Sequence, residues 1–402
     1  MSKLEAYYGL PSKVKFCKKC VISNQRPSST IEFKSEIGEK KQVISFNDQG
    51  ICSACAFQYE KEKNINWNHR EDKLLKLLDR FRSNDGSYDV IVPGSGGKDS
   101  AFTSHVLKYK YGMNPLTVTW APHLYTDIGW ENMQEWIHTG GLDNIIYTPN
   151  GILHREMTKN AFHNLLHPFQ PFIVGQRIIG PAMAKKFGVK LVMYGENQAE
   201  YGNAIEENTN PLMNMDFFSS DDHLDMKFGG IKMKKYLETG KYKKEDFLPY
   251  IAPSKKTLID FGTEVHYLGY YLKWDPQECY YYAVENTGFA ANPIRTEGTY
   301  SKYSSIDDKI DPFHYYTTLI KFGIGRCTYD ASQEVRNGKI TREEAVYLVN
   351  KYDTEFPEIY FKDFLNYITT TEEDFWKTID RHRSPHLWFK DAKDWKLRNR
   401  IT

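Results

Sequence analysis

A glycine-rich loop that ends in a lysine and an aspartate is the part of this sequence best suited to chemistry. The stretch YDVIVPGSGGKDSAF (residues 88–102) passes from an apolar segment through three glycines to Lys98 and Asp99. Glycines let the backbone turn tightly before a helix, where free N–H groups can hold phosphate. The loop therefore predicts a phosphate cradle.

Two common phosphate-binding motifs do not fit this loop. A Walker loop requires glycine where the chain has Val92, and serine or threonine where it has Asp99. The dinucleotide pattern Gly-x-Gly-x-x-Gly also fails at Asp99. The sequence therefore does not support a GTPase-like protein or an NAD-binding enzyme.

Two cysteine pairs form a second chemical pattern. Four of the 6 cysteines fall into Cys-x-x-Cys pairs, Cys17/Cys20 and Cys52/Cys55. Two such pairs can complete a closed tetrahedral site, which leaves no open position for catalysis. We expect a structural zinc ion. The alternative is four ordinary buried thiols, because the pairs lie farther apart than in most zinc ribbons.

Composition indicates a soluble globular protein of enzyme size, with no overall charge that would favour nucleic acid or membrane. The 402 residues include 53 Lys+Arg and 52 Asp+Glu, so a net charge of +1 creates no field that favours anionic polymers or lipids. No apolar run approaches the roughly 20 residues of a membrane span, and the start MSKLEAYYGLPSK lacks a signal-peptide core. We therefore expect a cytoplasmic protein.

The elements that must position these residues alternate between strand and helix patterns. Apolar runs predict strands within residues 88–93, 115–120, 144–147, 190–194 and 264–272. Helical patterns cover about 99–111, 130–138, 153–166, 175–187 and 276–288. This alternation predicts an α/β fold with a parallel, doubly wound sheet, preceded by a zinc module at 1–66 and followed by a helical region at 296–402.

The loop SGGKDS (residues 95–100) resembles the PP-loop of the ATP pyrophosphatase superfamily, whose members cleave ATP between its α and β phosphates. The resemblance implies that residues 67–295 form a sheet domain of the HUP, adenine nucleotide alpha hydrolase-like, type. Asp99 would then hold Mg²⁺ against the phosphates, with a helix N-cap as the alternative role. The implied ATP-binding residues are Pro93, Gly94, Ser95, Gly96, Gly97, Lys98, Asp99, Ser100, Thr119, Trp120, Gly195 and Asn197.

Loops that follow the other strands complete the predicted site, because ligands bind there in open α/β sheets. The loop after 115–120 would cup the adenosine and bring Asp127 toward the substrate. The loop GENQAEYGN (195–203) would supply Glu196 as a second magnesium ligand and Glu200 as a contact to the acceptor, although a solvated acidic loop is the alternative for Glu200. The candidate catalytic residues are Lys98, Asp99, Asp127, Glu196 and Glu200.

Longer stretches narrow the resemblance to one family. LYTDIGWENMQEWI, HPFQPFIVGQ, YGENQAEYGN, WDPQECYYYAVENTGF and YSSIDDKIDPFHYYTTLIKFGIGR, with the cysteine pairs, resemble the N-acetyl sugar amidotransferases of lipopolysaccharide and flagellin-glycan biosynthesis. Those enzymes convert the N-acetyl group of a sugar or nucleotide sugar to an acetamidino group. The alternatives are a tRNA-modifying enzyme of the same superfamily and a non-enzymatic nucleotide sensor. The resemblance implies substrate contacts at Asp307, Asp308, Lys321 and Arg326.

The source of ammonia is not apparent in the chain. Cys279 and Cys327 lack the Gly-x-Cys-x-Gly surroundings of a glutaminase nucleophile. The resemblance implies a separate glutaminase partner. The basic segment 232–244 and the helical C-terminal region are the candidate docking surfaces.

Two further patterns favour ordinary structure. His163 and His167 are spaced i, i+4, but Asn164 stands where a zinc protease motif has glutamate, so a second metal site is the weaker hypothesis. TYDASQEVRNGKITREEA (328–345) superficially resembles a helix-turn-helix. Because the net charge is near zero, a packed helical hairpin is the stronger interpretation.

Overall fold

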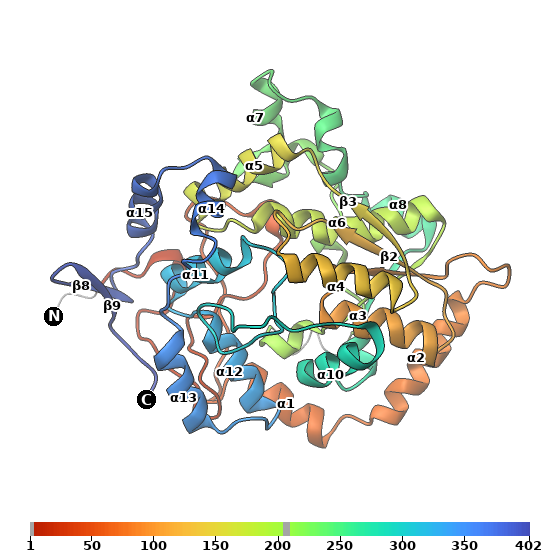
Figure 1. Ribbon diagram of the computed structural model, residues 1–402, viewed down its shortest axis with the longest axis horizontal. Coiled ribbons are helices and arrows are strands. Elements are labelled where there is room, and N and C mark those ends of the chain that lie inside the picture. Colours follow the sequence, from red (N-terminus) through yellow and green to blue (C-terminus); the bar gives the residue numbers. More distant parts are fainter. Residues whose placement is uncertain (1–3, 204–209) are drawn as a thin grey trace.

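A five-stranded parallel sheet forms the centre of the computed structural model, which describes residues 4–203 and 210–402 (Figure 1). Its strands follow the order β3-β2-β1-β4-β7. The chain leaves β1 in one direction for β2 and reaches β4 on the other side, and ligands bind at such a switch point. The predicted α/β doubly wound sheet is confirmed. The strands are β1 (Val90–Pro93), β2 (Pro115–Trp120), β3 (Asp143–Tyr147), β4 (Leu191–Tyr194) and β7 (Glu264–Tyr267).

The central strands are apolar along their whole length because helices cover both faces of the sheet. Every residue of β1 and β2 is buried, and Val90 of β1 lies between Pro115 and Leu191 of its two neighbours. One face carries α3 (Lys98–His105), α4 (Asp127–His138) and α10 (Pro276–Thr287); the other carries α6 (Gln170–Phe187) and α8 (Lys255–Phe261) (Figure 1).

Helix α6 lies directly on β2 because one of its residues is glycine. A Cβ at Gly175 would come within 2.2 Å of the Trp120 ring. The helix therefore fixes where β2 ends and where its own apolar side chains face the edge of the sheet.

Two predicted elements are each divided into two different elements in the structure. The predicted helix at 153–166 is α5 (Gly151–Asn160), which continues as a π-helical turn (Ala161–Leu165). The predicted strand at 264–272 ends at Tyr267 and becomes the short helix α9 (Leu268–Tyr271). The chain turns there because the Gly269 amide donates a hydrogen bond to the Gly195 carbonyl, which an extended strand could not reach.

Several shorter elements complete the sheet domain and the N-terminal part. Helix α2 precedes β1, and a π-helical turn (Val106–Lys110) extends α3. The remaining elements before the C-terminal region are η1 (Tyr7–Gly9), η2 (Glu32–Lys34), α1 (Ser53–Lys63), α2 (Trp67–Phe81), η5 (Gln198–Tyr201), η7 (Met215–Phe217), η8 (His223–Asp225), β5 (Lys227–Phe228), β6 (Ile231–Lys232), α7 (Met233–Glu238) and η9 (Lys244–Tyr250).

The C-terminal region is helical, as predicted, but ends in a hairpin that the sequence analysis did not predict. Helices α12 and α13 pack against each other as the expected helical hairpin. The elements are α11 (Asp311–Phe322), α12 (Arg326–Arg336), α13 (Arg342–Tyr352), α14 (Phe361–Ile368), α15 (Glu372–Arg381), β8 (Trp388–Asp391) and β9 (Asp394–Leu397).

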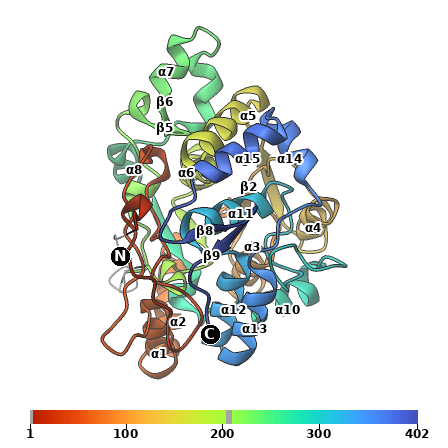
Figure 2. The same cartoon turned by 90° about the vertical axis from the view of Figure 1, so that its left-hand side faces the viewer.

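The N-terminal part packs against this C-terminal region. The amide of Tyr7 donates a hydrogen bond to the Ser384 hydroxyl, and Ile324 lies in the same apolar cluster as the four paired cysteines. In Figure 2 the C-terminal elements lie in front of the sheet with the N-terminal segment beside them. The division of the chain at residues 66 and 295 remains a prediction.

Candidate active site

The glycine-rich loop connects β1 to the first turn of α3. Gly96 has a φ of +83°, and a Cβ there would lie 2.8 Å from the Met133 backbone. At Gly97, the residue before α3, a Cβ would meet nothing closer than the Ser95 hydroxyl at 4.0 Å. Close packing therefore explains why position 96 is glycine, but it does not explain the glycine at position 97. The missing side chain of Gly97 leaves open space before the N-terminus of the helix. Such a space can receive a phosphate group.

A cavity of about 440 Å³ opens above this loop at the carboxyl ends of β1 and β4; we call it the loop cavity. Its size falls within the range of small-molecule sites. The structure brings together in its wall most of the residues that the sequence predicted. These are Pro93, Gly94, Ser95, Gly96, Gly97, Lys98, Asp99, Ser100, Gly195, Glu196, Asp307 and Asp308.

Three charged groups meet at one end of the loop cavity. The Lys98 ammonium lies 2.5 Å from the Asp99 carboxylate. Burial and the negative charge of Asp99 raise the pKa of Glu196 to about 7, whereas Lys98 opposes this rise. Burial lowers the pKa of Lys98, but Asp99 and Glu196 outweigh it and the net pKa is raised. The arrangement places one cation and two carboxyl groups where phosphate would sit.

The donor set at this position fits Mg²⁺. Asp99 Oδ1 is buried and has no hydrogen-bond partner among the described residues, although its other oxygen is paired with Lys98. Glu196 lines the same cavity. Carboxylate oxygens are the protein ligands that Mg²⁺ prefers, usually beside substrate phosphates. Asp99 and Glu196 are therefore the residues that would hold the ion.

A second cavity, of about 410 Å³, meets the loop cavity at the same three charged groups. We call it the arginine cavity because Arg26, Arg326 and Arg336 line it. Lys98, Asp99 and Glu196 belong to both walls. Two ligands that occupied the two cavities would therefore meet at Lys98, Asp99 and Glu196.

The predicted substrate residues Asp307 and Asp308 anchor loops around the site. Ser95 of the glycine-rich loop hydrogen-bonds through its side chain to Asp307. Asp308 accepts hydrogen bonds at 2.7 Å from both the amide and Nδ1 of His123, and at 2.9 Å from the Ile310 amide. These contacts join the C-terminal region to the loop after β2.

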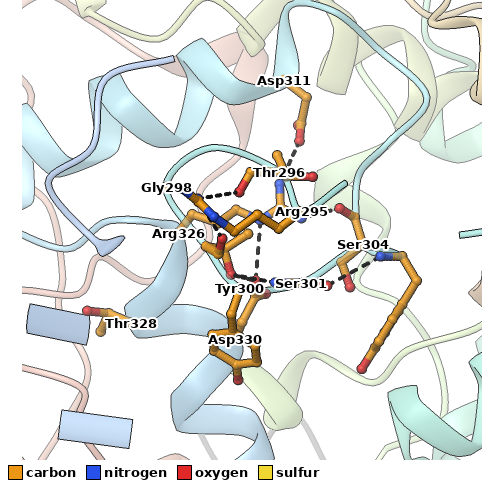
Figure 3. Close-up of polar contacts among 12 residues, drawn as sticks. Arg295, Thr296, Gly298, Tyr300, Ser301, Ser304, Asp311, Arg326, Thr328 and Asp330 are labelled. Carbon is orange, nitrogen blue, oxygen red and sulfur yellow. Dashed lines mark hydrogen bonds and ion pairs between the residues drawn. The ribbon is translucent and has the colours of Figure 1, made fainter. Parts of the chain in front are cut away.

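Arg326 is engaged by protein groups (Figure 3). Its Nη1 lies 3.0 Å from Asp311, its Nε lies 3.5 Å from Asp330, and it donates a hydrogen bond to the Ser304 carbonyl. Burial and the nearby acids of the C-terminal region raise the pKa of Asp311 to about 7 despite this contact. Arg326 therefore holds Ser304 against α12, and because it also lines the arginine cavity, its contact with substrate stays a prediction.

Four other predicted residues lie away from both cavities. Thr119 is buried and accepts a hydrogen bond from Asn144, and Trp120 is stacked on Tyr147 in the core. Both side chains are packed against other protein groups, because β2 is covered on both faces. Asn197 caps the turn η5 through the Ala199 amide. Asp127 is exposed in the first turn of α4, where its negative charge interacts favourably with the helix dipole.

Glu200 is in a buried ion pair. Its carboxylate oxygens lie 2.9 and 3.1 Å from the Lys61 ammonium on α1, and its backbone carbonyl accepts a hydrogen bond from Arg336. Burial raises the pKa of Glu200, and Lys61 counters this rise. The residue joins the N-terminal part to the sheet domain, and its role as an acceptor contact stays a prediction.

This ion pair gives a stability prediction. Lys61→Ala should lower the free energy of unfolding by about 3–5 kcal/mol, because it leaves the Glu200 carboxylate buried without its partner. Replacing both residues, in Lys61→Met/Glu200→Leu, should cost much less. Urea unfolding of both variants measures the difference. A single variant as stable as the wild type would contradict the buried pairing.

An apolar wall of the loop cavity was not predicted from the sequence. Apolar and aromatic side chains of this kind offer a surface on which a flat ring could pack. The stretch HPFQPFIVGQ contains part of it, but nothing in that pattern distinguishes cavity residues from core residues. The wall consists of Phe169, Phe172, Ile173, Met213 and Phe289.

The four paired cysteines converge in one buried cluster. The sulfur atoms of Cys17 and Cys55 lie 3.9 Å apart, those of Cys20 and Cys52 lie 3.7 Å apart, and all four ligand atoms lie within 4.8 Å of one another. A tetrahedral site with metal–sulfur bonds of about 2.3 Å separates its sulfurs by about 3.8 Å. The donor set therefore fits a metal ion.

We expect Cys17→Ser and Cys52→Ser each to lose the bound metal and to lower the thermal midpoint by about 5 °C or more, because metal binding supplies folding free energy. Metal analysis and thermal unfolding of the purified variants measure both effects. Cys327→Ser is the matched control, since Cys327 is buried outside the cluster. A purified wild-type protein without stoichiometric metal would contradict the site.

The spaced histidines do not converge. His163 hydrogen-bonds Thr378 and Thr370, whereas His167 lies 3.3 Å from Glu32 and stacks on His314. Within residues 4–203 and 210–402, the cysteine cluster is the one group of ligand side chains that meets the spacing of a metal site. The histidine spacing therefore reflects packing.

The fold and the loop agree with the class of protein that the sequence resembles. A parallel sheet in the order β3-β2-β1-β4-β7, with a Gly-Gly-Lys-Asp loop at its switch point, is the arrangement expected of a PP-loop protein. Residues 297–402 match the family model described as the C-terminal domain of WbpG-like LPS biosynthesis proteins. The C-terminal region is therefore similar to a domain of lipopolysaccharide-biosynthesis proteins.

Other similarities are more distant. An uncharacterized protein of Methanocaldococcus jannaschii is 31% identical over 78 residues, which is 19% of this chain and about a quarter, 27%, of that protein. An NH₃-dependent NAD synthetase from Campylobacter jejuni has 16% identity and a TM-score of 0.29, over 49% of this chain and 92% of its own. A U34-tRNA thiolase from Methanococcus maripaludis, solved with its [4Fe-4S] cluster, has 14% identity and a TM-score of 0.31, over 83% and 88%.

None of the helices in the described parts of the chain combines the length and the apolar character that crossing a bilayer requires.

Proposed function

We propose that this protein is an ATP-dependent amidotransferase that converts the N-acetyl group of a sugar or nucleotide sugar to an acetamidino group, in the cytoplasmic part of lipopolysaccharide or flagellin-glycan biosynthesis. The observation that carries the proposal is the meeting of two cavities at Lys98, Asp99 and Glu196. One cavity follows the phosphate-binding loop, and the other can hold a second substrate. The match of residues 297–402 to an LPS-biosynthesis domain supports a sugar as that substrate.

The reaction needs an activated amide, because an amide oxygen is a poor leaving group. The acetamido oxygen attacks the α phosphorus of ATP, the bond to the β phosphate breaks, and pyrophosphate leaves. Ammonia then adds to the imidate carbon, AMP departs with the former amide oxygen, and loss of a proton gives the amidine. Water must be excluded in the second step, since hydrolysis would return the amide and waste the ATP.

The residues of the site divide this work between them. The backbone N–H groups at Gly97 and in the first turn of α3 bind phosphate. Lys98 stabilises the charge that develops as pyrophosphate leaves. Asp99 and Glu196 would hold Mg²⁺, which supplies charge neutralisation at the phosphates. The apolar wall of the loop cavity packs against the adenine base.

We propose zinc as the metal of the cysteine cluster, because the sulfur separations of 3.7 and 3.9 Å match one tetrahedral ion. Four thiolates also ligate iron–sulfur clusters. Zinc and iron analysis of the purified protein decides between them.

We also propose a separate glutaminase as the source of ammonia. Cys279 and Cys327 are buried, with 2% and 0% exposure, and burial raises the pKa of both thiols. A nucleophilic cysteine requires access and a lowered pKa. Neither residue meets these conditions.

Pyrophosphate release tests the proposed function. Purified protein with Mg²⁺, ATP and ammonium should release pyrophosphate when a nucleotide-linked N-acetyl sugar is added, but not when bulk tRNA is added. The matching sugar with a free amine is the control, because it has no amide oxygen to activate. Release that depends on tRNA would instead support an RNA-modifying enzyme.

A further inference from the structure

A third cavity of the molecule lies beside the two described above. Its volume is about 840 Å³, and we call it the lysine cavity because Lys321 lies in its wall. The N-terminal segments around Tyr8 and Glu32, the turn after α5, and helices α11 and α15 enclose it. A cavity of this size accommodates a ligand as large as a nucleotide.

Lys321 enters this cavity as a buried cation without a carboxylate partner among the described residues. Its ammonium donates one hydrogen bond, of 2.7 Å, to the Leu165 carbonyl and lies over the Tyr8 and Phe322 rings at 4.9 and 5.1 Å. The side chain is 7% exposed. Burial lowers the pKa of Lys321 to about 7. A buried ammonium in this position gains stability when an anion binds beside it.

Three acidic residues of the same wall have cationic partners of their own. Glu39 lies 2.8 Å from Lys41, Glu32 lies 3.3 Å from His167, and Glu36 is paired with a lysine of β5. Glu32 and Glu39 act on Lys321 only through space, and neither forms an ion pair with it.

Several polar atoms of the wall have no hydrogen-bond partner within the described chain. They are the Ser35 hydroxyl, Arg177 Nη1, His314 Nδ1 and one carboxylate oxygen, Glu32 Oε2. Ser35 is 4% exposed. Buried polar atoms are normally paired, so a group of unpaired ones around a cavity indicates a place for a polar ligand.

The lysine cavity adjoins the reaction centre. Arg177 and Ile173 line both it and the loop cavity, while Thr318 and Tyr329 line both it and the arginine cavity. His314 lies in the wall of all three. A ligand anchored at Lys321 could therefore extend past His314 toward Lys98 and Asp99.

We infer that the lysine cavity binds the anionic end of the acceptor substrate, with Lys321 and Arg177 as its counter-charges, while the N-acetyl end reaches the reaction centre. This inference rests on the proposed function for the identity of the ligand. The shared chemistry is a phosphate or carboxylate on a sugar: either the diphosphate of a nucleotide sugar or an acid group of the sugar itself.

Calorimetric binding tests this inference without turnover. Full-length protein is first saturated with Mg²⁺ and α,β-methylene ATP, so that the loop cavity is filled, and is then titrated with uridine diphosphate or with glucuronate. We expect one of the two probes to bind, and Lys321→Met to weaken its binding at least tenfold. Binding of uridine diphosphate assigns the nucleotide diphosphate as the anion, whereas binding of glucuronate alone assigns a sugar carboxylate.

Two further variants control the experiment. Lys377→Met changes an exposed lysine of α15 and should leave binding unchanged. Lys321→Met should keep the thermal midpoint of the wild type, because it removes an unpaired buried charge. If it does not fold, Ser35→Leu, which fills part of the cavity, should weaken the same binding.

Failure of both probes to bind the wild type, or equal binding by the folded Lys321→Met or Ser35→Leu variant, would overturn the inference. The proposed function fails separately, when N-acetyl sugars do not stimulate pyrophosphate release although the anion still binds.

Discussion

Replacing Asp99 by asparagine is expected to lower the rate of pyrophosphate release by about 10²–10³-fold while the protein remains folded. The substitution keeps the shape of the side chain and removes its charge. Because Asp99 Oδ1 is buried without a partner and Oδ2 is paired with Lys98, the lost charge acts on both the metal position and the lysine. Coupled pyrophosphate detection at saturating ATP and acceptor measures the effect.

Asp127→Asn is the matched control, since it removes the same charge from an exposed position at the start of α4. We expect it to release pyrophosphate at nearly the wild-type rate. Near-normal release by a folded Asp99→Asn protein would remove Asp99 from the mechanism. A loss confined to Asp127→Asn would restore the role that the sequence analysis gave to this residue.

The isolated protein is expected to form amidine from ATP and concentrated ammonium at alkaline pH, where free NH₃ is available, and to form none from glutamine. Both cysteines outside the metal cluster are buried, and burial raises the pKa of each thiol. Neither can become the exposed thiolate that attacks glutamine. Quantifying amidine with each nitrogen donor, at equal protein concentration, measures the difference.

Addition of the cognate glutaminase should restore the use of glutamine at neutral pH, because ammonia delivered within a complex reaches the imidate before water does. Segment 232–244 and the helical C-terminal region remain the candidate docking surfaces. Glutamine-dependent turnover by this chain alone at high purity would contradict the two-protein scheme. Cys279→Ala and Cys327→Ala would then identify the nucleophile.

Local sequence patterns were enough to predict the sheet and the glycine-rich loop. The loop residues follow one another in the chain, and the strand before them is apolar along its length, so both features are visible within about fifteen residues. The cysteine pairs were predictable for the same reason, because each pair carries its own spacing. In the structure the loop follows β1 and the four cysteines form one cluster, as the patterns predicted.

Side-chain direction at strand ends could not be predicted. Thr119 and Trp120 lie at the end of a strand that is buried on both faces, and such a strand lacks the alternation that would show which side chains face a ligand. The buried ion pair of Glu200 could not be predicted because its partner, Lys61, is 139 residues away. An acidic loop residue looks the same in sequence whether it is solvated or paired.

The lysine cavity illustrates the same limit at a larger scale. Its wall combines segments from both ends of the chain with the turn after α5, and no local pattern joins them. The sequence predicted a substrate contact for Lys321 but could not show that it lies in a different cavity from Asp307 and Arg326. That separation becomes visible only in the folded chain.

The most direct test of the proposed function follows the acetamido oxygen. An N-acetyl sugar substrate labelled with heavy oxygen in its acetyl group is incubated with protein, Mg²⁺, ATP and ammonium, and AMP is analysed by mass spectrometry. Attack of the amide oxygen on the α phosphorus predicts one heavy oxygen in each AMP and an unlabelled amidine product. AMP without label, or heavy oxygen in pyrophosphate, would contradict activation through an adenylated imidate.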